Sequence, residues 1–213
     1  VPFLSKSTGV EMARIATRVM LGHSLKEQGI TEVYHMESSR YYVKSPAFSF
    51  AKIKGADSYL SPEMKSTGEA IGYDKSLKRA LYKSLQACGM TVMNYGTVLV
   101  TIADEYKPAA LPLIKRFYNM GFNIEATEGT ADFHHKHSIR TRNLKKISEG
   151  SDEMIKSIRS GHVNYVINTI DINQHNTRRD GYEIRQVAVE NNVTLLTSLE
   201  TVGVLLDVLE DIT

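Results

Sequence analysis

Two threonines and a glycine in the run Asn123-Ile124-Glu125-Ala126-Thr127-Glu128-Gly129-Thr130 are residue types that can hold an anion. The run is interpreted as a short strand that ends in a polar turn, where Thr127 and Thr130 supply hydroxyl groups and Gly129 lets the backbone pass close to a ligand. A turn that leads from a strand into a helix presents free backbone N–H groups, which favour a negative charge. The same residues are ordinary turn formers, so a purely structural turn is the alternative.

Other polar side chains stand where strands are expected to end in the second part of the chain. Apolar runs predict strands over 98–102, 124–127, 144–147, 165–168 and 194–197, and helical spacing predicts helices over 108–120, 151–161, 180–191 and 199–209. This α/β alternation predicts a parallel sheet flanked by helices, which binds ligands beyond the carboxyl ends of its strands. The residues expected there are Thr101, Thr127, Thr130, Asn168 and Thr169, together with Lys107 and Lys146 after the first and third strands. Two lysines, several hydroxyls and an amide favour a phosphate-sized site.

Structural alternatives exist for these residues. Lysines are usually solvated surface residues, and an asparagine at a strand end, such as Asn168, can simply cap the next loop. Arg178 and Arg179 beside Asp180 are interpreted as a charged loop that is able to touch a phosphate.

Histidines form the other cluster that invites a chemical interpretation. His134, His135 and His137 lack a fourth ligand at metal-site spacing, so no metal is expected. No Ser/His/Asp, Cys/His or phosphate-loop Gly-Lys-Ser pattern is present.

The first part of the chain is not expected to be a complete domain. Residues 1–5 look extended, and helical spacing follows over 9–21, with Thr8 as a possible cap and Gly22 as the end. A strand over 41–50 is interrupted by Pro46, and pieces of 62–72 are expected to pair with it before a helix over 76–88. These elements resemble the edge of a domain whose main body is missing.

Composition excludes several classes of partner. The 213 residues suit one domain plus a piece or two small domains, and 26 basic against 24 acidic residues give no electrostatic signature of nucleic-acid binding. The single cysteine, Cys88, allows no intramolecular disulfide and fits a reducing compartment, so a cytoplasmic location is expected. No apolar run is long enough to span a membrane and no signal sequence is visible; a start at Val1 without Met suggests a cut from something longer.

Several motifs in order resemble the C-terminal end of the carbamoyl-phosphate synthase large subunit. The run Pro62-Glu63-Met64-Lys65-Ser66-Thr67-Gly68-Glu69 looks like that family's Pro-Glu-Met-Arg-Ser-Thr-Gly-Glu. The first ten residues, Val1 to Val10, look like the segment after the metal-binding strand of its second ATP-grasp unit. Ala126-Thr127-Glu128-Gly129-Thr130-Ala131, Lys146-Ile147-Ser148-Glu149-Gly150 and Ile167-Asn168-Thr169 look like parts of its regulatory domain.

The resemblance implies two parts that meet near residue 90. Residues 1–90 are expected to complete the ATP-grasp domain that forms carbamoyl phosphate, and residues 91–213 to form an allosteric domain with the methylglyoxal-synthase-like fold. By this resemblance the effector pocket falls on Thr101, Lys107, Thr127, Thr130, Lys146 and Asn168. The implied effectors are phosphorylated metabolites such as UMP, IMP or a phosphoribosyl-pyrophosphate-like compound. Ile170 replaces a second family threonine, which leaves the exact nucleotide open, and Asp180 falls on a loop acid that helps to transmit the signal.

The same resemblance assigns the chemistry to the parent enzyme rather than to this chain. The parent reaction uses glutamine, bicarbonate and two ATP with Mg²⁺ or Mn²⁺, and its metal-binding carboxylates are expected upstream of Val1. The implied partners are the upstream domains of the large subunit and the glutaminase small subunit, and a homo-oligomer through the C-terminal domains is compatible.

A lyase is the competing function, because methylglyoxal synthase uses the same fold to eliminate phosphate from dihydroxyacetone phosphate. Its Gly-Gly-Asp base is matched only by Gly150-Ser151-Asp152, one residue out of step. The positions of its flanking histidines fall on Ala103 and Thr177, although His175 is close. The lyase is therefore the weaker prediction.

Ornithine sensitivity of the parent enzyme is expected to be low. Ornithine-responsive relatives carry a Glu on the strand that here spans 41–50 and a Tyr two residues before a Thr in the last strand. Ser45 and Leu195 occupy those positions, and only Thr197 matches. Loss of the carboxylate removes a charge-assisted contact, and leucine offers no hydrogen bond.

Overall fold

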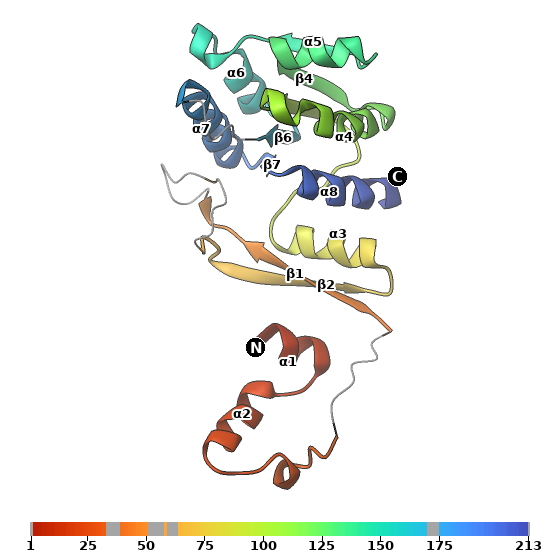
Figure 1. The fold of residues 1–213 in the computed structure, drawn as a ribbon, viewed down its shortest axis with the longest axis vertical. Helices are drawn as coiled ribbons and strands as arrows, with labels where there is room; N and C mark the ends of the chain where they lie inside the picture. The colour runs from red at the N-terminus through yellow and green to blue at the C-terminus, as the bar shows by residue number, and fades with distance from the viewer. Residues whose placement is uncertain (1, 33–38, 51–57, 59–63, 170–174, 213) are drawn as a thin grey trace.

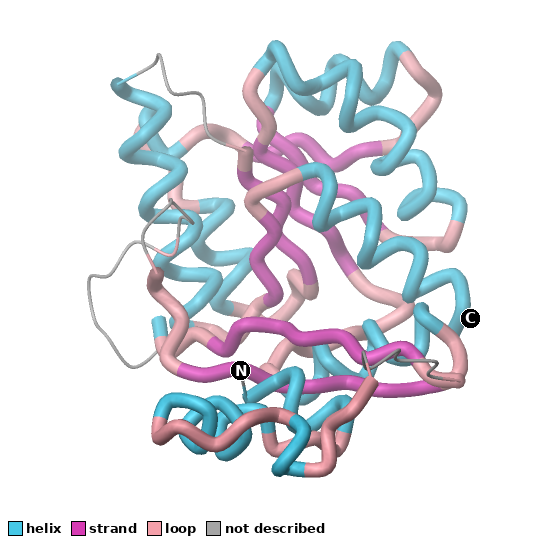
Figure 2. Tube along the Cα trace, turned by 60° about the horizontal axis from the view of Figure 1, so that its bottom comes forward, coloured by secondary structure: helices cyan, strands magenta, loops and turns pink. Residues whose placement is uncertain are grey.

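A five-stranded parallel sheet forms the centre of the second part of the chain (Figure 2). The computed structural model describes residues 2–32, 39–50, 58, 64–169 and 175–212. The strands are β3 (Thr97–Thr101), β4 (Asn123–Thr127), β5 (Thr141–Leu144), β6 (Tyr165–Asn168) and β7 (Thr194–Leu196), in the order β5-β4-β3-β6-β7. All four neighbouring pairs are parallel, so the carboxyl ends of the strands share one edge.

Helices cover both faces of this sheet, as the alternating sequence pattern predicts. Val98 and Val100 of β3 point to one face, where they pack with α4 (Lys107–Asn119), α5 (Glu128–Lys136) and α8 (Leu199–Ile212). Leu99 points to the other face and packs with α6 (Glu153–Arg159) and α7 (His175–Glu190). The β3 strand is buried on both sides, which explains its continuous apolar run.

The preceding elements form an antiparallel strand pair with one helix on it. β1 (Tyr41–Ala47) pairs with β2 (Gly68–Asp74), and α3 (Leu77–Ala87) covers one face of the pair. Gly72 permits this close approach, because a Cβ atom there would overlap the backbone of Ala80 and Ser84. α3 in turn packs on α8, so Figure 1 shows it between the strand pair and the parallel sheet.

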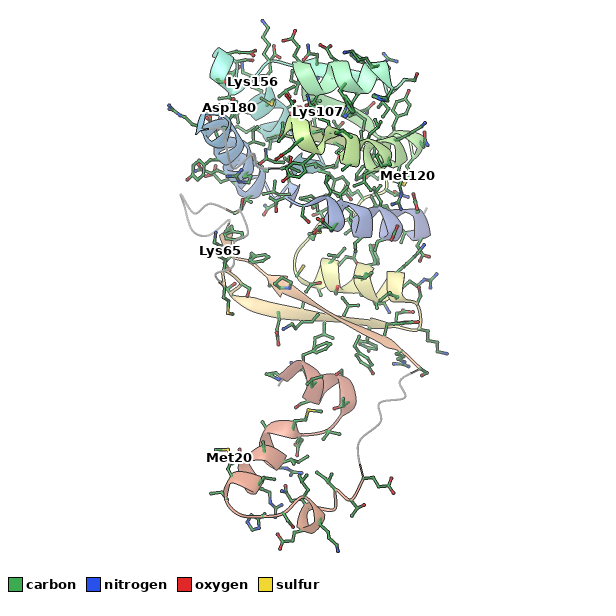
Figure 3. All side chains as sticks on the ribbon, viewed as in Figure 1. Met20, Lys65, Lys107, Met120, Lys156 and Asp180 are labelled. Atoms are coloured by element: carbon green, nitrogen blue, oxygen red, sulfur yellow. The ribbon has the colours of Figure 1, made fainter. Side chains whose placement is uncertain are left out.

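The first helices lie at the other end of the molecule from α5 (Figure 1). α1 (Pro2–Thr8), α2 (Met12–Met20) and the single turn η1 (Lys26–Gln28) contain no buried residue, although α2 is strongly amphipathic. Met20, labelled at this end in Figure 3, is among the exposed apolar residues.

The prediction that residues 1–5 are extended is wrong. Proline is favoured at the first position of a helix, and Pro2 begins α1. Thr8 belongs to the end of that helix, where its hydroxyl donates to Leu4 O at 2.7 Å and accepts from Val10 N at 3.1 Å. It is therefore no cap for the next helix, α2, whose N-cap residue is Glu11.

Other element boundaries also differ from the prediction. β1 continues through Pro46, because a strand of a two-stranded sheet has an open edge on which a missing N–H does no harm. The third strand ends at Leu144 rather than Ile147, where the 3-10 turn η4 (Ile147–Glu149) begins. Asp152, not Ser151, precedes the first residue of α6. The predicted element over 62–72 contains Pro62 and Glu63, which lie outside the described residues.

One helix of the structure was not predicted, and another begins earlier than predicted. α5 follows β4 directly, where the sequence pattern predicted only a turn. α7 begins at His175 rather than Asp180, so Arg178 and Arg179 belong to the helix and not to a charged loop before it. Within the described residues, no helix is long and apolar enough to cross a membrane.

Candidate anion-binding site

A cavity of about 450 Å³ opens at the carboxyl ends of the parallel strands. All six residues predicted for the effector pocket line it: Thr101, Lys107, Thr127, Thr130, Lys146 and Asn168. Thr169 and Asp180 line it as well. The parallel topology brings them together: Thr101, Thr127 and Asn168 end β3, β4 and β6, and the other residues lie in the segments that follow β3, β4, β5 and β6.

A buried polar chain forms the floor of the cavity. Asn168 Nδ2 donates to Thr101 Oγ1 at 2.7 Å, and Arg185 Nη1 donates to Asn168 Oδ1 at 2.9 Å. Arg185 is only 3% exposed, and Asn168 is also buried. The arginine therefore fixes which way the amide points. Asn168 thus bridges β3 and α7.

Lys107, the first residue of α4, lines the cavity, and Figure 3 labels it at the start of that helix. Its ammonium donates to Gly129 O at 2.7 Å and pairs with Asp104 Oδ1 at 2.6 Å. Asp104 comes from the single turn η3 (Asp104–Tyr106). The hydrogen bond from Lys107, more than any other cause, lowers the pKa of Asp104, and the charges of Lys107 and Lys146 lower it further.

The first turn of α5 supplies backbone N–H groups to the same cavity. Thr127 occupies the N-cap position, but its side chain makes no capping hydrogen bond to the helix. Its hydroxyl instead lies 3.4 Å from that of Thr130. Gly129 and Thr130 line the cavity, so the positive end of the helix dipole faces it.

Lys146 and Asp180 are connected through the turn η4. Lys146 is exposed and precedes η4, and Ser148 N within that turn donates to Asp180 Oδ2 at 3.0 Å. Asp180 belongs to α7 and is labelled on that helix in Figure 3. This carboxylate consequently ties α7 to the turn that carries the second lysine.

Sequence reasoning missed Arg185, Asp104 and Gly181, which also line the cavity. Arg185 stands next to Ile184 on a helix stripe that continues to Ala188, all of them buried. A charged residue within an apolar stripe was the available signal. Gly181 is small where Arg185 Nη1 and Asn168 Oδ1 come close, which spacing alone does not reveal.

The remaining residues predicted to carry chemistry lie away from the cavity or outside the described residues. Arg179 is exposed and does not line the cavity, while Ile170 and the side chain of Arg178 lie outside the described residues. His134 is buried and bonded to Thr141 Oγ1 at 3.2 Å through Nδ1, and burial lowers its pKa to about 4. Among the described residues, no group of three or more His, Cys, Asp or Glu side chains is able to hold a metal ion.

Comparison with known proteins gives a match to a family model and likeness to solved structures. One solved structure, that of methylglyoxal synthase from Elizabethkingia anophelis NUHP1, is similar at a TM-score of 0.43 and 14% identity, covering 54% of this chain and 79% of that one. The family-model match spans β4 to β7 and the cavity residues from Thr127 to Arg185, while Thr101 and Lys107 precede it. Residues 109–197 match the MGS-like domain family.

Proposed function

We propose that the cavity binds a phosphorylated metabolite as an allosteric effector. The observation that carries this proposal is the meeting of two lysines and a helix N-terminus at one cavity: Lys107, Lys146 and the first turn of α5 all line it. Ammonium groups and free backbone N–H groups are what a phosphate requires. A volume of about 450 Å³ is within the range of small-molecule pockets.

The larger assignment is that this chain is the C-terminal region of a glutamine-dependent carbamoyl-phosphate synthase large subunit, in pyrimidine or arginine biosynthesis. Its support is the ordered set of motifs in the sequence, above all the Pro-Glu-Met-Lys-Ser-Thr-Gly-Glu run at 62–69. The MGS-like match of residues 109–197 is compatible with an allosteric domain. Within this proposal the effector acts on a ligase whose ATP, Mg²⁺ or Mn²⁺ and glutaminase subunit are engaged by other parts of the enzyme.

Calorimetric titration tests effector binding directly. The panel is UMP, IMP, phosphoribosyl pyrophosphate and, as the control without phosphate, uridine. At least one phosphorylated compound should bind while uridine does not, because most of the binding energy is assigned to the phosphate. Failure of every phosphorylated compound to bind would overturn the proposal.

The lyase alternative needs a positioned base with a pKa near the working pH. Asp152 does not line the cavity, and its carboxylate pairs with Lys156 at 2.9 Å. That hydrogen bond lowers the pKa of Asp152, as Lys107 does for Asp104, so both carboxylates are weak bases. We expect no methylglyoxal from dihydroxyacetone phosphate. Turnover that disappears in Asp152→Asn would favour the lyase instead.

We expect ornithine to have little effect on the parent enzyme. Ser45 is buried and bonded to Ser84 Oγ at 2.8 Å, so it faces α3. Leu195 packs with the α6 and α7 side of the sheet. The measurement is an ornithine titration of carbamoyl-phosphate synthesis by the full enzyme at subsaturating ATP. Strong activation would show that other residues form an ornithine site.

A further inference from the structure

The ammonium group of Lys107 already has an anionic partner within its own chain. Asp104 Oδ1 lies 2.6 Å from Lys107 Nζ, and Gly129 O accepts from the same ammonium at 2.7 Å. The lysine side chain is only 12% exposed, whereas that of Asp104 is 90% exposed. One side of the ion pair is therefore held inside the site and the other lies in solvent.

The two partners of Lys107 differ in how firmly they are held. Gly129 O belongs to the backbone of α5, at the point where that helix begins. Asp104 belongs to a single 3-10 turn, and an ion pair with one exposed member stabilises little. Gly129 thus positions the ammonium, and the Asp104 carboxylate is free to move away without loss of that position.

Because the Asp104 carboxylate is negatively charged, it competes with any bound anion for Lys107. Lys107 and Lys146 both act on this carboxylate, as the lowering of its pKa by each of them indicates. The side chains that line the cavity include three cations, Lys107, Lys146 and Arg185, and two carboxylates, Asp104 and Asp180, a difference of one positive charge. A phosphate bound to Lys107 beside an intact Asp104 would face a like charge at close range.

We propose that Asp104 sets the ligand specificity of this site, because its carboxylate occupies Lys107 until an anion of higher charge displaces it. Replacing the Asp104 carboxylate at Lys107 by another monoanion, such as a free carboxylate, gains no attraction to the lysine. A phosphate dianion carries one more negative charge and is therefore attracted to Lys107 more strongly. The site therefore selects phosphate over carboxylates and chloride. This inference rests on the proposed function, since it names the means by which the same cavity recognises its ligand.

Inorganic phosphate is the probe that tests the inference. Titration calorimetry compares the unmodified chain with Asp104→Asn, which keeps the side-chain shape and removes the charge. Phosphate affinity should rise about two- to fivefold, the range expected when an exposed competing ion pair is removed. Acetate should compete with phosphate in Asp104→Asn and should not do so in the unmodified chain.

A matched control separates this local effect from net charge. Asp207 Oδ1 pairs with Arg116 Nη2 at 2.6 Å, on α8 and α4 and not at the cavity. Asp207→Asn changes the net charge equally and should leave phosphate affinity unchanged. In a Lys107→Met background, Asp104→Asn should give no gain, since the competition acts through Lys107.

The outcomes distinguish this inference from the proposed function. Phosphate binding that is weakened by Lys107→Met but is unchanged or weakened by Asp104→Asn would overturn the role of Asp104 and leave the anion site intact. A gain that persists in the Lys107→Met background would also overturn it. Absence of phosphate binding in both the unmodified chain and Asp104→Asn would overturn the proposed function and this inference with it.

Discussion

Individual side chains around the cavity divide into those that are fixed by burial and those that are exposed. Lys146 belongs to the exposed group, so its ammonium is available to a ligand and its removal should not disturb the fold. Arg185 and Asn168 belong to the buried group, where every polar atom is held by a neighbour or costs free energy. The two groups call for different experiments.

Lys146→Ala should weaken the binding of a phosphorylated ligand about tenfold or more, because a charge-assisted phosphate contact contributes about 1.5–3 kcal/mol. The melting temperature should stay the same. Lys145→Ala is the matched control, since Lys145 is also exposed and does not line the cavity. Equal affinity of the two variants by calorimetry would place the anion elsewhere.

Arg185→Met should lower both stability and affinity. Methionine fills part of the same volume but leaves Asn168 Oδ1 without its hydrogen bond from Arg185 Nη1. The free energy of unfolding should fall by about 1–3 kcal/mol, measured by chemical denaturation. Arg179→Met, on the exposed side of the same helix, should change neither quantity. A stable Arg185→Met variant with full affinity would show that the amide needs no partner.

At the scale of elements, α5 links the candidate site to a titratable core residue. Its first turn faces the cavity with Gly129 and Thr130, and His134 lies on the buried side of its last turn against β5. His134 is neutral in the folded protein because burial, and then the charge of Lys107, lowers its pKa to about 4. The unfolded chain takes up this proton at its ordinary pKa, so acid favours unfolding.

The stability of the protein should therefore fall as the pH drops from about 6.5 towards about 4. Between about pH 7.5 and about pH 5, His134 should account for a loss of roughly 2 kcal/mol. Denaturant unfolding at the two pH values measures this loss, which should be smaller in His134→Gln. His23→Gln, at an exposed position after α2 and outside the surroundings that lower the His134 pKa, should keep the dependence of the unmodified chain. Equal pH dependence in all three proteins would contradict the assignment.

Sequence periodicity predicted most of the sheet and of its helices because strands such as β3 and β6 are buried runs and helices such as α4 and α8 have an apolar stripe. It missed α5 because Gly129 and Thr130 are weak helix formers, and the helix forms through tertiary packing of Ala131 and His134. It also missed the start of α1, where an N-terminal proline was read as extended. In α5 tertiary packing overrode the local helix propensity, and in α1 the preference of proline for the first helical position was misjudged.

The candidate site was largely predictable for a topological reason. Parallel strands place their carboxyl ends together, so Thr101, Thr127 and Asn168 had to meet once the alternation was recognised. Arg185 was not predictable in the same way, because its role depends on the direction in which a helix residue points. Nor was the pairing of Asp104 with Lys107, since η3 is a single turn without a sequence signature.

At the scale of the whole molecule, the buried apolar residues are distributed unevenly. Both hydrophobic clusters of the described chain are formed almost entirely by residues after Met90, whereas α1 and α2 bury nothing. The segment before β3 is tied to the sheet: Tyr165 donates to Met93 O at 2.7 Å, and Thr194 Oγ1 donates to Thr91 O at 2.9 Å. The independently folding unit should accordingly begin near residue 90 rather than at β3.

A fragment of residues 90–213 should fold cooperatively, with a sigmoidal thermal transition by circular dichroism, while residues 1–89 should not. The loss of α3 uncovers part of α8, so the fragment should melt somewhat below the full chain.

A fragment of residues 97–213 is the sharper comparison, because it lacks Thr91 and Met93 and the packing of Val92. Its free energy of unfolding should be about 1–3 kcal/mol lower than that of 90–213. Equal stability of the two fragments would show that these contacts do not belong to the folding unit, and a folded fragment 1–89 would show that the first part of the chain has a core of its own.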